Sequence, residues 1–179
     1  MVTCGPAHVR SVDGAEYMMV LNDGGSSYHT GYFLTSKSSD VMLSTFTEYH
    51  TRSEHETGKK LIRLRVNMGS KFFNKKWREY TMRHGITVEF SAPYTHSQNR
   101  VAEHGMRTII EGIHCILADS GLPPSLWADA DTFIIYTQNL IPSARHPGLV
   151  PTEKGRGDVK TYLTCTHSDV FHMPRFQQN

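Results

Sequence analysis

The sequence predicts an α/β domain, and three observations support that prediction. Two short apolar runs, 17–21 and 28–34, are separated by the turn signal Asn-Asp-Gly-Gly-Ser-Ser at 22–27, a pattern typical of an antiparallel hairpin. Further along, segments with helical spacing alternate with short strand-like runs. The third observation is a long amphipathic stretch that begins at Asn99 and stops at Gly121.

Length and composition indicate one globular domain. A chain of 179 residues with 38% hydrophobic and 20% charged residues can bury one substantial core. Three widely spaced cysteines argue against a disulfide framework and favour a reducing compartment. No apolar run reaches the roughly 18 residues of a membrane span, and no signal-peptide pattern is present. We therefore expect an intracellular protein with no membrane partner.

The first expected helix covers 39–55. Leu43, Phe46 and His50 recur at helical spacing after a Ser-Asp start, and Gly58 closes the segment. The hairpin before this helix supplies two neighbouring strands, so the first half of the chain predicts a helix next to a sheet.

The middle of the chain predicts a strand, a helix and another strand. Residues 61–66 form an alternating strand with Asn67 at its C-terminal end, where functional groups collect in open α/β sheets. A helix that ends before Gly85 follows, and 86–90 resumes a strand. Aromatic residues at i, i+4 and i+7 mark the apolar face of that helix: Phe73, Trp77 and Tyr80.

The clearest pattern starts at Asn99 and predicts a long helix with Glu103 one turn in. The helix ends at Gly121 because two prolines follow, and a second helix is expected over 125–140 with Trp127 as a core anchor. The apolar stripe of the long helix has a period of 3.6 residues: Ala102, Met106, Ile109, Ile110, Ile113, Ile116 and Leu117.

Two segments resemble the integrase core of copia-type LTR retrotransposons. Residues 65–72 read R-V-N-M-G-S-K-F against the family's R-S-D-N-G-x-E-F, and 91–104 include P-Y-T-H-S-Q-N-R-V-A-E-H against P-Y-T-P-Q-Q-N-G-V-A-E-R. The resemblance implies an RNase H-like fold, a mixed five-stranded sheet flanked by helices. It implies a core over 1–142 and an extension over 143–179 that resembles the segment after the core in copia polyproteins. Shorter matches lie at 4–6, 14–17, 127–130 and 139–143.

The resemblance also implies an active site, in which one of three catalytic carboxylates is retained. Glu103 matches the catalytic glutamate, Asn67 stands in place of the second aspartate, and Val2 occupies the position of the first. Asp23 matches an aspartate in the turn after the second strand, so we expect a structural role, with a substitute metal ligand as the alternative. Local roles are the alternatives elsewhere: Asn67 as a helix cap or turn residue, and Glu103 as a solvated partner of Arg107.

The losses predict a core without catalysis. The family uses two Mg²⁺ or Mn²⁺ ions to activate the attacking oxygen and to stabilise the leaving oxygen of a phosphodiester. A pair of unit charges about 4 Å apart interacts by roughly 4 kcal/mol at an effective dielectric constant near 20, and a divalent ion doubles this. With Asn67 and Val2 in place of carboxylates, any ion held by Glu103 and Asn67 would be bound weakly or not at all.

The resemblance implies that the partner is nucleic acid and that the protein acts in the nucleus. DNA is the expected partner and RNA the alternative, and no small-molecule substrate is expected. The net charge of +2 permits this without requiring it. A solvated helix face is the alternative explanation for the lysine and arginine side chains that could bind phosphate. The other open functions are a non-catalytic binding or assembly module that forms a homodimer through its helices, and an unselected chain with no function. The candidate phosphate-binding residues are Lys71, Lys75, Lys76, Arg78, Arg100 and Arg107.

Overall fold

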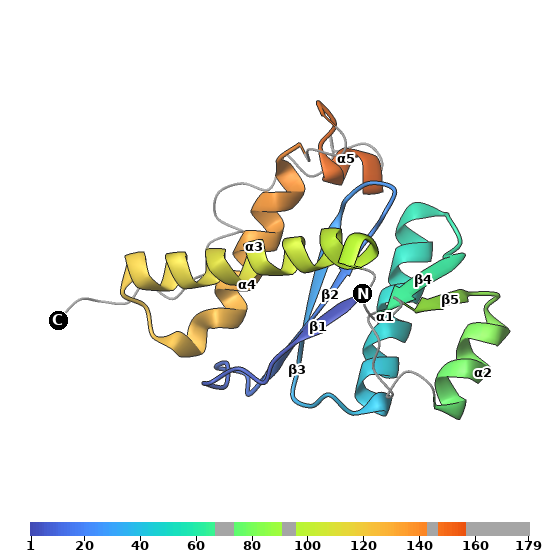
Figure 1. Ribbon diagram of the computed structural model, residues 1–179, viewed down its shortest axis with the longest axis horizontal. Coiled ribbons are helices and arrows are strands. Elements are labelled where there is room, and N and C mark those ends of the chain that lie inside the picture. The colour runs from blue at the N-terminus through green and yellow to red at the C-terminus, as the bar shows by residue number, and fades with distance from the viewer. Residues whose placement is uncertain (67–73, 91–95, 143–146, 157–179) are drawn as a thin grey trace.

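The computed structural model describes residues 1–66, 74–90, 96–142 and 147–156, with the backbone alone at 96–104 and 155–156. It shows a mixed α/β architecture in which strands and helices alternate along the chain (Figure 1). The elements in chain order are β1 (Val2–Cys4), β2 (Tyr17–Asn22), β3 (His29–Leu34), α1 (Ser39–Thr57), β4 (Arg63–Val66), α2 (Lys75–Arg83), β5 (Thr87–Phe90), α3 (His96–Ser120), the 3-10 turn η2 (Pro124–Leu126), α4 (Trp127–Leu140) and α5 (Pro151–Arg156).

The five strands form an antiparallel and a parallel group that lie next to each other. β1, β2 and β3 pair in that order and antiparallel, whereas β4 and β5 pair in parallel. The amino group of Met1, just before β1, donates a hydrogen bond of 2.8 Å to the carbonyl oxygen of Arg65 in β4. This bond sets β1 beside β4, which gives the described strands the spatial order β3-β2-β1-β4-β5.

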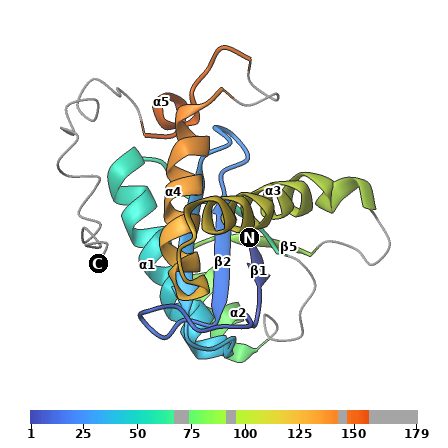
Figure 2. The same ribbon diagram turned by 90° about the vertical axis from the view of Figure 1, so that its left-hand side faces the viewer.

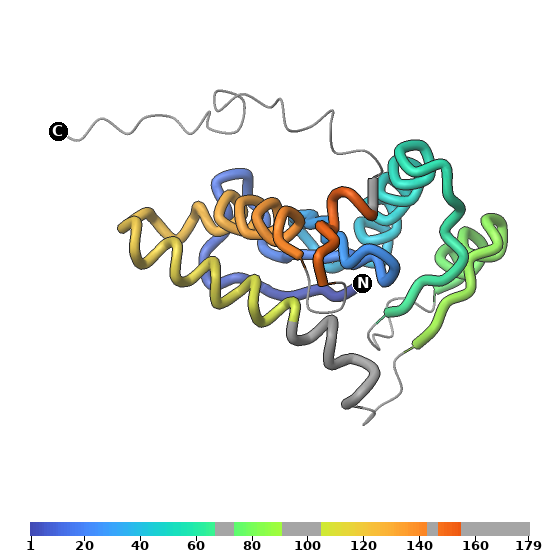
Figure 3. The backbone as a smooth tube through the Cα atoms, turned by 90° about the horizontal axis from the view of Figure 1, so that it is seen from above, coloured from blue at the N-terminus to red at the C-terminus, as the bar shows by residue number. Residues whose placement is uncertain are grey.

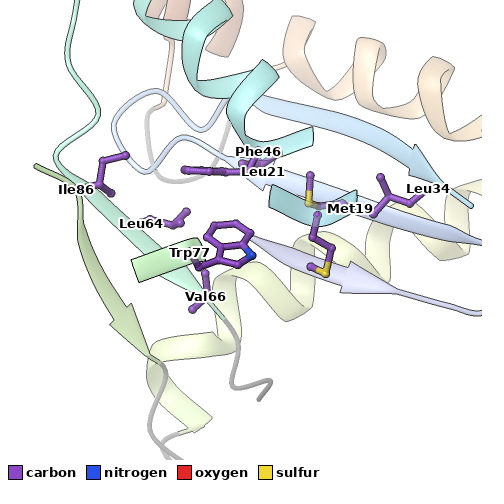
Figure 4. Close-up of a cluster of buried hydrophobic side chains, with 9 residues drawn as sticks. Met19, Leu21, Leu34, Phe46, Leu64, Val66, Trp77 and Ile86 are labelled. Atoms are coloured by element: carbon purple, nitrogen blue, oxygen red, sulfur yellow. The ribbon is translucent and has the colours of Figure 1, made fainter. Parts of the chain in front are cut away.

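One hydrophobic core fills the face of the strands that α1 and α2 cover (Figure 4). Residues of both strand groups meet in it, because Met19 and Leu21 of β2 share the cluster with Leu64 and Val66 of β4. Together with α1, the unit of β4, α2 and β5 forms one end of the molecule (Figure 3). Burial of a large apolar side chain contributes about 1.5–3 kcal/mol, so this cluster holds the two strand groups together. The helices contribute Met42, Phe46 and Trp77.

A second core lies on the opposite face, under α3 and α4. Met18 and Val20 of β2 point into it, because successive side chains of a strand alternate between faces. α4 runs along the hairpin of β2 and β3 (Figure 2). The helices contribute Met106, Ile109, Ile113, Ala130 and Ile135.

The helix ends follow the expected capping rules. α1 begins after Ser38, whose side chain accepts a hydrogen bond from the Val41 amide, and ends at Gly58 in the left-handed conformation. The α2 helix is capped by Asn74, whose side chain accepts from the Trp77 amide at 2.9 Å. The N-cap of α2 is therefore Asn74 and not Asn67, which was the alternative from the sequence. Asn67 itself lies outside the described residues.

Most element boundaries differ from the predictions by one or two residues, and β4 begins at Arg63 instead of Leu61. α3 begins at His96, before the apolar period that defined its expected start. The helix expected from Ser125 starts as a short 3-10 turn that includes Pro124.

Part of the segment after residue 142 packs against the core. Pro151 is fully buried, and the Thr152 hydroxyl donates a hydrogen bond of 2.7 Å to the carbonyl oxygen of Asn139. Among the described residues, no helix has both the length and the apolar character that crossing a bilayer requires.

Candidate functional site

Val2 occupies a half-buried position in β1, facing α3. It pairs with Val20 of β2 and packs against the core under α3 and α4. Val2 also lines a cavity of about 20 Å³ together with His29 and Gly105. Gly105 follows Glu103 by two residues, so β1 places position 2 beside the helix turn that comes after Glu103.

The end of β4 lies next to this position. The hydrogen bond from the Met1 amino group reaches Arg65, which precedes Asn67 by two residues. Asn67 follows Val66 directly and lies outside the described residues, as does the side chain of Glu103. At the level of the backbone, β1, the end of β4 and the first half of α3 thus converge on one edge of the sheet.

Asp23 lies in the β2–β3 turn, three residues beyond Val20, which pairs with Val2. Its carboxylate accepts hydrogen bonds from the Ser26 amide at 2.9 Å, the Ser26 hydroxyl at 2.5 Å and the Gly25 amide at 3.3 Å. Partial burial acts to raise the pKa of Asp23, but these hydrogen bonds and the charge of Lys59 outweigh it, and the pKa is lowered. Asp23 is therefore an ionised turn residue that organises its own loop.

The alternative in which Asp23 is a substitute metal ligand stays a prediction. Asp23 lines a cavity of about 350 Å³ with Lys59 and Leu61, which precede β4, whereas Asn67 follows the other end of that strand. Its neighbour Asn22 lines the small cavity that Val2 and Gly105 share.

Of the six predicted phosphate-binding residues, the side chains of four are described. Lys75 forms an ion pair with Glu79 at 3.8 Å, and Lys76 forms one with Asp40 at 2.8 Å. Arg78 in α2 and Arg107 in α3 are exposed to solvent. Lys71 and the side chain of Arg100 lie outside the described residues. Exposed ion pairs are worth about 1 kcal/mol at most, so the lysines remain able to exchange their partners for a phosphate.

Asp131 is a functional group that the sequence analysis overlooked. It is fully buried in α4, and neither carboxylate oxygen accepts a hydrogen bond from the described residues. Burial raises the pKa of Asp131 to about 7. The carboxylate faces β3, since a Cβ atom added to Gly31 would lie 3.1 Å from its Oδ2. The spacing of four residues from both Trp127 and Ile135 could have revealed a carboxylate on the apolar face of the helix.

Asn139 of α4 was also overlooked in the sequence, and it joins this helix to the edge strand β3. The Asn139 side chain accepts a hydrogen bond of 2.8 Å from the His29 amide and donates one of 2.8 Å to the His29 carbonyl. These two bonds cover the backbone of the edge strand β3, which would otherwise be free to pair with another chain. Burial lowers the pKa of His29, which favours the neutral ring.

The residues at the candidate site do not fit a divalent-ion centre. Val2 has no donor atom, Asn67 offers a neutral amide, and only Glu103 supplies a carboxylate at the three converging positions. Hard divalent ions need several oxygen ligands, most of them charged.

Comparison with known proteins identifies the class of the chain. No family model matches it. It is 32% identical over 181 residues to the retrovirus-related Pol polyprotein from transposon TNT 1-94 of Nicotiana tabacum, a match that covers 98% of the chain and 13% of the polyprotein. The chain thus spans only a small part of that relative.

Solved structures share the fold. A chain of the simian T-cell lymphotropic virus intasome in complex with PP2A regulatory subunit B56 gamma aligns with a TM-score of 0.66 and 12% identity, over 88% of this chain and 54% of that one. The HTLV-2 integrase catalytic core domain in complex with magnesium aligns at 0.61 in its trimeric form and 0.59 in its dimeric form, both at 15% identity and over 86% of this chain. These alignments cover 95% and 94% of the HTLV-2 chains. The predicted RNase H-like α/β fold and the resemblance to an integrase core are confirmed.

Proposed function

We propose, from the premise that this chain is an integrase-like core domain of retrotransposon type, that it binds nucleic acid in the context of DNA integration and does not itself join DNA. The observation that supports the proposal is Val2. It lies beside the turn of α3 after Glu103, and its side chain packs into the core where the family's first carboxylate would stand. A nuclear location and a core over 1–142 with an extension over 143–179 belong to the same proposal.

The chemistry supports loss of turnover more strongly than loss of binding. Strand transfer needs ions held by several carboxylates, and two of these positions are occupied by Val2 and Asn67. Phosphate binding needs exposed cations, and α2 and α3 still present them at Lys75, Arg78 and Arg107. The same fold can therefore keep its affinity for nucleic acid after its catalysis has gone.

We expect the purified chain to bind duplex DNA with a steep dependence on salt and to show no cleavage or joining with Mn²⁺. Changing Arg107 of α3 to glutamine should lower the slope of log K against log salt by about 0.9, the contribution of one phosphate contact. Fluorescence anisotropy at several KCl concentrations measures the slope, and a labelled-oligonucleotide gel measures turnover. Metal-dependent cleavage that Glu103→Gln abolishes would refute the loss of catalysis.

A homodimer is a second candidate role, favoured by an apolar stripe on α4. Phe133, Tyr136 and Leu140 are 40%, 45% and 39% exposed and follow one another at i, i+3 and i+7. A row of large exposed apolar side chains on one helix face marks a surface that other proteins cover. We propose that a second copy of this chain covers it.

Sedimentation of the native chain over a range of concentrations should show a reversible dimer, and Tyr136→Glu should yield a monomer with an unchanged melting temperature. Met82→Glu is the matched control, because Met82 is 74% exposed on α2, outside the stripe, and should leave the dimer intact. A native chain that stays monomeric at high concentration would rule out this role.

A further inference from the structure

β4 presents two arginines on the face of the sheet where the candidate site lies. Leu64 and Val66 point into the core beneath α1 and α2, so strand alternation directs Arg63 and Arg65 to the opposite face. Val2 faces that same side, because it packs against the core under α3 and α4. The bond between the Met1 amino group and Arg65 keeps the two strands adjacent.

Glu89 of β5 contacts both of these arginines. Its Oε2 accepts hydrogen bonds from Arg65 Nε at 3.2 Å and Nη2 at 2.9 Å, and its Oε1 lies 3.8 Å from Arg63 Nη1. The parallel register pairs Arg65 directly with Glu89. One carboxylate thus orients two guanidinium groups, and the three side chains together carry a net charge of +1.

The group remains open to a ligand. The side chains of Arg63 and Arg65 are 75% and 56% exposed, and that of Glu89 is 33% exposed. Arg65 uses two of its five N–H groups to donate hydrogen bonds to Glu89. Its other N–H groups can donate to an anion. Ion pairs at this exposure are weak, at about 1 kcal/mol or less, so a phosphate can compete with Glu89 for either arginine.

The cations of α2 are on the other side of this part of the sheet. Trp77 anchors α2 in the core with Leu64 and Val66, on the face opposite Arg63 and Arg65. A nucleic acid that lies over Val2 and the start of α3 would therefore meet the β4 arginines before it met Lys75.

We propose that Arg63 and Arg65, oriented by Glu89, form a phosphate-binding platform on the site face for the backbone of DNA. The inference rests on the proposed nucleic-acid binding and adds which residues contact the phosphates there. A guanidinium fork matches the geometry of a phosphodiester, and two such forks on neighbouring positions of one strand face can contact successive phosphates.

The test is anisotropy with a short fluorescein-labelled duplex over a KCl series. Changing Arg63 and Arg65 together to glutamine should lower the slope of log K against log salt by about 1.8, whereas changing both to lysine should preserve it. Glu89→Gln should tighten binding at low salt, because it removes the competing charge. Arg10→Gln is the matched control: Arg10 is also an exposed arginine paired with a glutamate, Glu16, but it lies in the loop after β1, which contacts η2.

The outcomes separate the two proposals. If the native chain binds with a steep salt slope and the double glutamine variant keeps that slope, the platform is wrong while nucleic-acid binding stands. Weaker binding by Glu89→Gln, in a variant whose melt matches the native chain, would also overturn the platform. If the native chain shows no salt-dependent binding, both proposals fail.

Discussion

Asp131→Asn should raise the free energy of unfolding by about 3 to 4 kcal/mol at a pH of about 8, because the core keeps a carboxylate that has no hydrogen-bond partner among the described residues. Asparagine has nearly the same volume and cannot ionise. A shift of the pKa from the ordinary value of 3.8 to about 7 corresponds to three units, each worth about 1.4 kcal/mol.

The pH dependence follows from the direction of that shift. The pKa of Asp131 is higher in the native chain than in the unfolded chain, so the native chain binds more protons between the two values. The free energy of unfolding is therefore highest below pH 3.8, as far as Asp131 determines it. It falls as the pH rises and levels off above about pH 7. His29 acts in the opposite direction, because burial lowers its pKa and acid favours the unfolded chain.

Urea unfolding of the native chain and of Asp131→Asn at several pH values isolates the effect. The difference in free energy of unfolding between the two proteins should grow from a few tenths of a kcal/mol at about pH 4 to its full value at about pH 8. His29 is present in both proteins, so its contribution cancels from the difference. Asp129→Asn is the matched control, since Asp129 is exposed in the same helix and should change stability by under 1 kcal/mol. A constant difference across the series would mean that Asp131 is solvated.

Local patterns predicted most of the fold. The positions of Leu43, Phe46 and His50 identified α1, and Gly58 ends it in the structure as predicted, because a left-handed cap suits glycine. Four of the five described strands and the long helix α3 were also predicted from local patterns, whereas the first strand came from the family resemblance. These features depend on a few neighbouring residues, whose spacing is visible in the chain.

Contacts between distant segments were not visible in the same way. Nothing in the sequence around Asn139 states that its side chain bonds to the backbone of His29, 110 positions away in the chain. Periodicity places a residue on a helix face without naming the strand that it meets, and for the same reason Arg63 and Arg65 could not be assigned to the face of Val2. The family pattern supplied the candidate site, and the fold then placed Val2 beside Gly105 of α3.

The double variant Val2→Asp with Asn67→Asp should acquire a metal response that we expect the native chain to lack. Without metal, two new carboxylates near Glu103 repel one another, and the variant should lose roughly 1–3 kcal/mol of stability because one of them replaces a half-buried valine. With millimolar Mn²⁺, an ion can bind between the three carboxylates and stabilise the native state by about 2.7 kcal/mol once its concentration reaches 100 times the Kd.

Thermal melts with and without Mn²⁺ measure both halves of this prediction. The native chain should melt at one temperature in both conditions, whereas the melt of the double variant should move down without metal and recover with it. Adding Glu103→Gln to the double variant is the control and should remove the recovery, because two carboxylates then remain instead of three. A native chain whose melting temperature rises with Mn²⁺ would show that Glu103 already belongs to a working ion site. The argument from weak metal binding for the loss of catalysis would then fail, and the labelled-oligonucleotide gel would decide whether the chain joins DNA.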